Sequence, residues 1–166
     1  MVKMRNPYSQ FALGLVILAC VAGAAGAQQY PPLEFADDLA AVAKLATTRQ
    51  APIMLVFTRP DCPFCLRAKK EHIEPMRVSQ NYGAKIIIRE IEAANDKIAL
   101  RDFDGNLTTH ADFARKYEIK SVPTVIVVDA RGKPLAESIV GLTSPDFYNL
   151  YLEQAIDAGR VQVRQK

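Results

Sequence analysis

Two cysteines three positions apart, Cys62 and Cys65, are the residues of this chain best suited to chemistry. Pro63 and Phe64 separate them, and residues 66–74 that follow are rich in helix formers. At the start of a helix, free backbone N–H groups and the positive end of the dipole stabilise a thiolate, which is the form of cysteine that attacks disulfides. The spacing therefore predicts that Cys62 attacks a disulfide and that Cys65, one turn further along, resolves the mixed disulfide.

Two charged residues precede this pair and act on it in opposite directions. Asp61 works against a thiolate at Cys62 and Arg59 favours it, and the sequence leaves their balance open. The pair could instead be a structural staple, but a disulfide that closes so short a loop adds little stability. We therefore interpret Cys62 and Cys65 as catalytic residues.

The two histidines and the acidic loop do not complete a metal site in the sequence. His72 follows Cys62 by ten residues, about 15 Å along a helix axis, which is too far for a Cys–His dyad, and we expect it to be exposed. His110 is expected at the solvated start of a short helix. Zinc needs about four ligands, and after cleavage the chain offers only two cysteines and two histidines. Residues 102–105 lack the remaining ligands of a calcium loop. We predict no metal and no cofactor.

The first 27 residues have the pattern of an export signal. Lys3 and Arg5 precede an almost wholly apolar run over 11–22, and Ala25-Gly26-Ala27 has the small residues that a signal peptidase cleaves. We therefore predict a signal peptide over 1–27, a single domain over 28–166, and a periplasmic location. An export compartment is oxidising, which suits a cysteine pair that forms its own disulfide.

The N-terminal pattern also allows two alternatives to cleavage. A retained membrane anchor needs about 20 unbroken apolar residues, and glycines at 14, 23 and 26 interrupt this run. A lipoprotein acylated at Cys20 is the other alternative, but Leu18 fits that motif poorly. We expect no stable membrane insertion after cleavage.

Composition and charge narrow the function further. Of the 166 residues, 49% are hydrophobic and 23% charged, as in an ordinary globular domain. Two of the 21 basic residues are Lys3 and Arg5, so the remainder is close to neutral against 18 acidic residues. Without a basic run to follow phosphates, the chain gives no support for nucleic-acid binding.

Hydrophobic periodicity and turn residues predict alternating helices and strands. Gly132 occupies a hairpin turn over 129–133, at a position that needs a positive φ. In chain order the expected elements are a helix over 33–50, a strand over 53–57, a helix over 66–74, a strand over 84–91, a helix over 110–117, strands over 124–128 and 135–140, and a helix ending near Gly159.

From residue 33 to 158 the chain resembles thioredoxin-fold proteins, in particular exported bacterial thioredoxin-like proteins of the disulfide-bond and sulfur-oxidation-linked groups. The motifs that carry the resemblance are a strand followed by Cys62-Pro63-Phe64-Cys65, the segment Ser121-Val122-Pro123-Thr124, and Gly141 after the last strand. The resemblance implies an α/β fold with a central four-stranded mixed sheet flanked by helices, and an insertion after the second strand.

The resemblance also implies a function and a substrate-binding loop. A cis Val122–Pro123 bond beside the cysteines would let Val122, Pro123 and Thr124 bind an extended substrate chain. The expected activity is thiol–disulfide exchange with protein or small-thiol substrates, together with a redox partner thiol protein. The alternative is a metal-delivery protein that holds Cu(I) between the same two cysteines, although related copper chaperones usually space them one residue further apart. Val56 stands where many cytosolic thioredoxins have a buried Asp, so their proton handling is not expected here.

The stretch 92–109 is longer than the corresponding connection in a minimal thioredoxin. Parallel strands end at the same sheet edge, so the insertion should start near Cys62. We expect Ile98, Leu100 and Phe103 to fold it down as a flap beside Cys62, with His110 at its base, although a plain solvated loop is the alternative.

Overall fold

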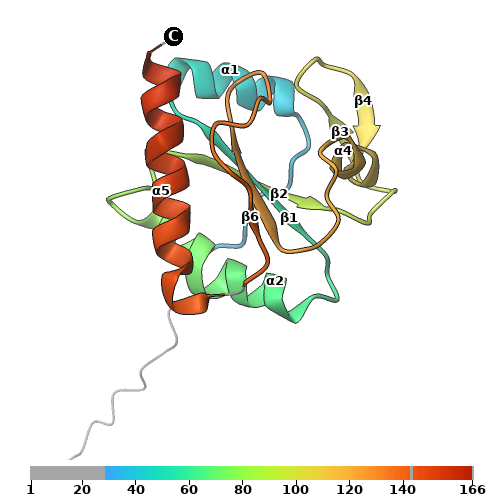
Figure 1. The fold of residues 1–166 in the computed structure, drawn as a ribbon. Helices are drawn as coiled ribbons and strands as arrows, with labels where there is room; N and C mark the ends of the chain where they lie inside the picture. The colour runs from blue at the N-terminus through green and yellow to red at the C-terminus, as the bar shows by residue number, and fades with distance from the viewer. Residues whose placement is uncertain (1–28, 143, 166) are drawn as a thin grey trace, which may run out of the picture.

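A four-stranded mixed sheet forms the centre of the protein, in the order β2–β1–β5–β6 (Figure 1). The computed structural model describes residues 29–142 and 144–165, so the predicted signal peptide and Cys20 lie outside the described residues. β1 pairs parallel to β2 and antiparallel to β5, which in turn pairs antiparallel to β6. The strands are β1 Ile53–Thr58, β2 Ile87–Glu92, β5 Thr124–Val128 and β6 Ile139–Val140.

Helices cover both faces of this sheet, and a small hairpin lies beside one of them. The helical elements are α1 Leu39–Arg49, α2 Pro63–Arg67, the π-helical segment η1 Ala68–Ile73, α3 Glu74–Val78, α4 His110–Lys116 and α5 Pro145–Arg164; the hairpin strands are β3 Ala99–Arg101 and β4 Leu107–Thr109. Figure 1 shows β3, β4 and α4 grouped on the side away from α5. Within the described parts of the chain, no helix has the length and apolar character needed to cross a membrane.

Side chains alternate between two hydrophobic cores, one on each face of the sheet. Met54 and Val56 of β1 pack with η1, α3 and α5, whereas Leu55 and Phe57 pack with α1 and α4. All six residues of β1 are buried, because a central strand with both faces covered contacts both cores. The predicted fold class is therefore confirmed, with three layers and β1 at the centre.

Two helix ends differ from the sequence prediction. The second helix was expected to stop at Pro75, yet the helical run continues to Val78. The wider turn of η1 ends just before Glu74, so Pro75 falls in the first turn of a new α-helix, where its missing N–H costs nothing. α5 continues past Gly159 to Arg164. A Cβ at residue 159 would lie 2.9 Å from Val127 Cγ1, so this glycine allows close packing on the sheet and does not end the helix.

The last strand is shorter than predicted. We expected a strand over 135–140, and only Ile139 and Val140 pair with β5. An isolated bridge joins Pro134 to Val128, and Pro134 has no N–H to continue a ladder. The preceding turn follows the prediction, since Gly132 has φ +78°.

The insertion after β2 does not form a flap over Cys62. Leu100 is fully buried in the core that contains Phe57 and Phe113, and the ring of Phe103 lies 6.2 Å from that of Phe113. The backbone N–H of Arg101 donates to the carbonyl of Asp37, which ties β3 to the start of α1. Alternate side chains of a hairpin face opposite sides, and the apolar side here covers the core instead of the cysteines.

Candidate active site

The cysteine pair lies at the start of α2, which follows β1 in the chain. Cys62 is the N-cap of α2 with extended backbone angles, and Pro63 begins the helix. The two cysteines form a disulfide, and the Cys65 N–H donates to Cys62 Sγ over 3.1 Å. In the reduced protein the same N–H can stabilise a Cys62 thiolate. Cys62 is partly accessible, whereas Cys65 is only 1% exposed.

The proline loop predicted from the sequence lies beside Cys62. The Val122–Pro123 bond is cis, and Val122 carbonyl oxygen is 3.9 Å from Cys62 Sγ. The Pro123 carbonyl accepts from the N–H of Gly141 over 2.7 Å, and the Thr124 hydroxyl donates to the backbone of its own loop. The structure thus brings Val122 and Cys62 together, while the roles of Val122, Pro123 and Thr124 in substrate binding stay a prediction.

Arg59 and Asp61, whose balance the sequence left open, form a two-pronged ion pair. Arg59 Nε donates to Asp61 Oδ1 over 3.1 Å, and a terminal guanidinium nitrogen donates to Oδ2 over 2.8 Å. This hydrogen bonding lowers the pKa of Asp61 and raises that of Arg59. Asp61, which directly precedes the catalytic pair, is therefore ionised at neutral pH and forms an ion pair with Arg59.

A buried polar cluster beneath the site was not predicted. Glu90 of β2 stands beside Val56 in the sheet register and is 3% exposed. Its Oε1 accepts from the Thr58 hydroxyl and from Lys69 Nζ, both over 2.6 Å. A glutamate inside the isoleucine-rich run of a buried strand was the available signal, since such a carboxylate requires a partner.

Lys69 connects this cluster to the surface around the cysteines. It lines a small hollow together with the residues from Arg59 to Pro63 and Leu66. Its side chain is 23% exposed, whereas the Glu90 side chain is 4% exposed. The Lys69 ammonium therefore stands between the hollow beside Cys62 and the interior of the protein.

The first turn of the insertion also reaches this region. Residues 94–97 line a polar groove with Glu92 and with the segment from Arg59 to Asp61. Asn95 holds the turn in place, because its side chain donates to Glu92 and accepts from the N–H groups of Lys97 and Ile98. This turn therefore lies beside the segment before Cys62, whereas Leu100 is buried in the core.

Neither histidine is placed as expected. His110 is fully buried, not solvated; Nε2 lies 2.8 Å from the Ala36 carbonyl, and Nδ1 accepts from the Glu92 N–H. Burial lowers the pKa of His110. His72 is half-buried and bonds Asn149 of α5. Both histidines therefore join elements of the fold that are distant in sequence. The sequence around each histidine gives no sign of these contacts.

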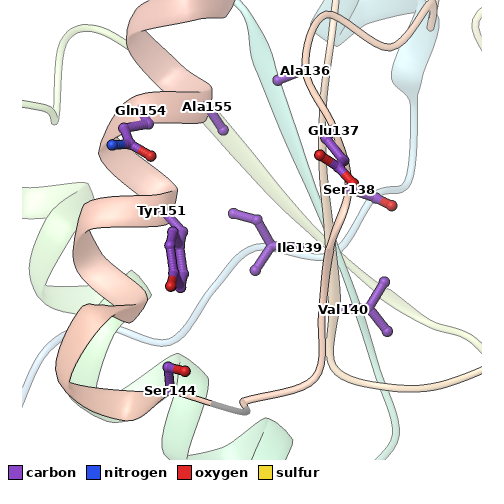
Figure 2. A pocket seen from close by; sticks show the side chains of 9 residues that line it. All are labelled: Ala136, Glu137, Ser138, Ile139, Val140, Ser144, Tyr151, Gln154 and Ala155. Carbon is purple, nitrogen blue, oxygen red and sulfur yellow. The ribbon is translucent and has the colours of Figure 1, made fainter.

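Other surface features lie apart from the cysteines. A groove between α5 and the segment 136–140 is lined by Tyr151, Gln154 and Ala155, and Figure 2 shows Ile139 pointing into it while Val140 points away. Among residues 29–142 and 144–165, no three His, Cys, Asp or Glu side chains are grouped so as to hold a metal ion.

Comparisons with known proteins identify the family of this chain. The family model for the thioredoxin-like domain matches residues 39–156. No curated protein matches the chain. Among solved structures, the chain is similar to a thioredoxin-fold protein from Helicobacter pylori, with 20% identity, a TM-score of 0.51, and coverage of 67% of this chain and 72% of that one. It is also similar to mitochondrial thioredoxin 3 from Saccharomyces cerevisiae, with 17% identity, a TM-score of 0.49, and coverage of 75% and 93%.

A disulfide at the start of a helix, on a thioredoxin fold, defines a thiol–disulfide oxidoreductase. The chain belongs to the thioredoxin-like domain family, whose model matches most of the domain from α1 to α5. Thioredoxin-like proteins generally exchange disulfides with protein substrates.

Proposed function

We propose that this protein is an exported thiol–disulfide oxidoreductase in which Cys62 attacks and Cys65 resolves. The observation that carries the assignment is the difference in accessibility between the two sulfurs. Cys62 is partly accessible and receives the Cys65 N–H, whereas Cys65 is 1% exposed. An incoming disulfide therefore meets Cys62 first.

The reaction proceeds in two exchanges. The Cys62 thiolate attacks a substrate sulfur, so that a Cys62–substrate disulfide forms, the substrate S–S bond breaks, and one substrate thiolate leaves. Cys65 loses its proton to solvent and attacks Cys62 Sγ, which forms the Cys62–Cys65 disulfide and releases the second substrate thiolate. Written in this direction, two electrons pass from the protein to the substrate, and the same steps in reverse oxidise a substrate dithiol. In either direction a partner thiol protein returns Cys62 and Cys65 to their starting state.

The loop over 121–124 supplies the substrate-binding surface in this proposal. Val122 carbonyl oxygen is 3.9 Å from Cys62 Sγ, so a substrate chain held in extended form against this backbone places its sulfur near the nucleophile. Pro123 and Thr124 are buried, and in this proposal they hold that backbone in place. A protein substrate would be read mainly through its main chain, which suits varied substrates.

A pair of single variants tests the two cysteine roles. Cys65→Ser should still attack and should accumulate mixed disulfides with a disulfide-bonded protein such as insulin, since only the resolving step is lost. Cys62→Ser should form none and should not catalyse insulin reduction with dithiothreitol. Trapped species are counted by non-reducing gel and mass spectrometry. Equal trapping in the two variants would contradict the assigned roles.

Export is tested separately, because the first 27 residues lie outside the described part of the chain. The full chain is produced in a bacterium with two membranes and recovered from the fraction released by osmotic shock. Its mass should correspond to residues 28–166. A full-length mass in the cytosolic fraction would refute export, and an acylated N-terminal Cys20 in the membrane fraction would replace the soluble periplasmic location with a lipid anchor.

A further inference from the structure

A carboxylate directly before the attacking cysteine should lower the fraction of that cysteine present as thiolate at neutral pH. A negative charge near a thiol favours the neutral form and so raises its pKa. Asp61 is exposed and immediately precedes Cys62, with its side chain 67% accessible. The Cys65 N–H already favours the thiolate, and a cation that pairs with Asp61 would remove the opposing effect of this carboxylate.

Arg59 offers that offset through geometry that a lysine would not reproduce. Both carboxylate oxygens of Asp61 accept from one guanidinium, over 3.1 Å and 2.8 Å. The planar fork of arginine matches a carboxylate in this way, which fixes the relative position of the two charges. Among the described residues Asp61 has no ion pair with another basic side chain.

Besides Arg59 and Asp61, one charged residue in the described part of the chain lines the hollow beside Cys62. Lys69 lines the hollow beside Cys62 but contacts Glu90 over 2.6 Å. Glu92, Asp96 and Lys97 line the adjoining groove rather than that hollow, and the proline loop over 121–124 carries no charged side chain.

We propose that Arg59 is a positioning residue whose fork cancels the charge of Asp61 and so preserves the nucleophilicity of Cys62. The proposal rests on the function proposed above, because it assigns a role to Arg59 in the reactivity of the attacking sulfur. Arg59 itself does not contact the reacting atoms. It acts through Asp61, so its effect should depend on whether Asp61 is charged.

The test measures how the alkylation rate of Cys62 by iodoacetamide varies with pH in the reduced full chain, read by peptide mass spectrometry. Arg59→Gln should raise the pKa of Cys62 by about half a unit to one unit, as expected for one uncompensated charge several ångströms away in a solvated site. Because a more basic thiolate is also more nucleophilic, the rate at pH 7 should fall only about twofold to threefold.

A double variant separates this mechanism from a general effect of charge. Asp61→Asn should leave the Arg59 charge uncompensated and shift the Cys62 titration to lower pH. The double variant Arg59→Gln, Asp61→Asn should titrate close to the unmodified protein, because both charges of the pair are gone. Arg59→Lys should raise the pKa of Cys62 by less than Arg59→Gln does, since it keeps the charge but loses the fork.

Arg67→Gln is the matched control, since Arg67 also makes a two-pronged pair, with Glu71, and both side chains are about half exposed. It should leave the Cys62 titration unchanged. The proposal is overturned when Arg59→Gln shifts the titration no more than Arg67→Gln does. It is also overturned when the double variant is shifted as far as Arg59→Gln alone.

Alkylation does not require disulfide exchange, so this experiment is independent of the trapping experiment with Cys65→Ser. A chain that fails to trap substrate but shows the Arg59 effect would refute the proposed function alone. A chain that traps substrate without the Arg59 effect would refute the role of Arg59 alone.

Discussion

Removing the Lys69 ammonium should destabilise the protein strongly, because it leaves the Glu90 carboxylate buried without its cation. Lys69→Met keeps most of the apolar stem and removes only the charged end. The Glu90 side chain is 4% exposed and accepts over 2.6 Å from Lys69 and from Thr58. After the substitution the Thr58 hydroxyl is its remaining side-chain donor in the described structure.

The size of the effect follows from this burial. Breaking a buried pair by removing one partner costs about 3–5 kcal/mol. Because Lys69 lines a hollow open to solvent, water can enter once the ammonium is gone, so we expect the lower value, about 3 kcal/mol. With a urea slope of about 1.5 kcal/mol/M, the unfolding midpoint should fall by about 2 M.

Urea unfolding of the oxidised protein measures this loss, and two further variants interpret it. Lys69→Met with Glu90→Gln removes both charges but keeps an acceptor for Thr58, so most of the stability should return. Arg67→Met breaks the exposed pair with Glu71 and should cost less than about 1 kcal/mol. A Lys69→Met midpoint equal to that of Arg67→Met would show that Glu90 does not depend on this cation, and the reasoning would fail.

Three further predictions concern the fold around the site. Since burial lowers the pKa of His110, the folded state binds fewer protons than the unfolded state below about pH 6.5. The free energy of unfolding should therefore fall between pH 7 and pH 5, and His110→Gln should flatten that slope; identical slopes in urea titrations would contradict this. Leu100→Ala should cost about 2–4 kcal/mol yet leave Cys62 alkylation unchanged, because Leu100 packs in the core behind Phe57; a changed alkylation rate would restore the flap hypothesis. Gly159→Ala should cost about 1–3 kcal/mol in thermal melts by overpacking α5 on the sheet, and an unchanged melting temperature would argue against it.

The features of the fold that depend on residues close together in the sequence were predictable. The buried run of β1, the cysteines at the start of a helix and the glycine turn at Gly132 each have a local signal, and each is confirmed. The parallel pairing of β1 with β2 also followed, because a helix joins them and a crossover of this kind has one preferred hand.

The errors concern residues whose environment depends on distant parts of the chain. Leu100 and His110 both lie against the start of the chain's first helix or its lead-in, through contacts with α1 and Ala36. A hydrophobic residue in an insertion is predicted to cover something apolar, but periodicity does not say which surface. Here Leu100 and Phe103 pack on the core that contains Phe57 and Phe113 rather than beside Cys62.

Pro75 and Gly159 show a related limit. Both residue types usually end helices, yet both lie inside helical runs because of geometry beyond their own position. The π-helical turn before Pro75 resets the hydrogen-bond pattern, and the close approach of α5 to Val127 requires the absence of a side chain at Gly159. Propensity describes the isolated helix, whereas the preceding π-helical turn accommodates Pro75 and packing on the sheet requires Gly159.

The acids around the cysteines illustrate why the sign of a charge does not predict its effect. Asp61 and Glu90 would each oppose a thiolate if unpaired, but each bonds a basic side chain, Arg59 or Lys69. With these charges balanced in pairs, the backbone N–H of Cys65 is the polar group left in direct contact with Cys62 Sγ among the described donors. On the proposal made for Arg59, the reactivity of Cys62 depends on helix geometry and on the Arg59–Asp61 pair, so a substitution that breaks this pair should act on the sulfur through the acid it leaves unpaired.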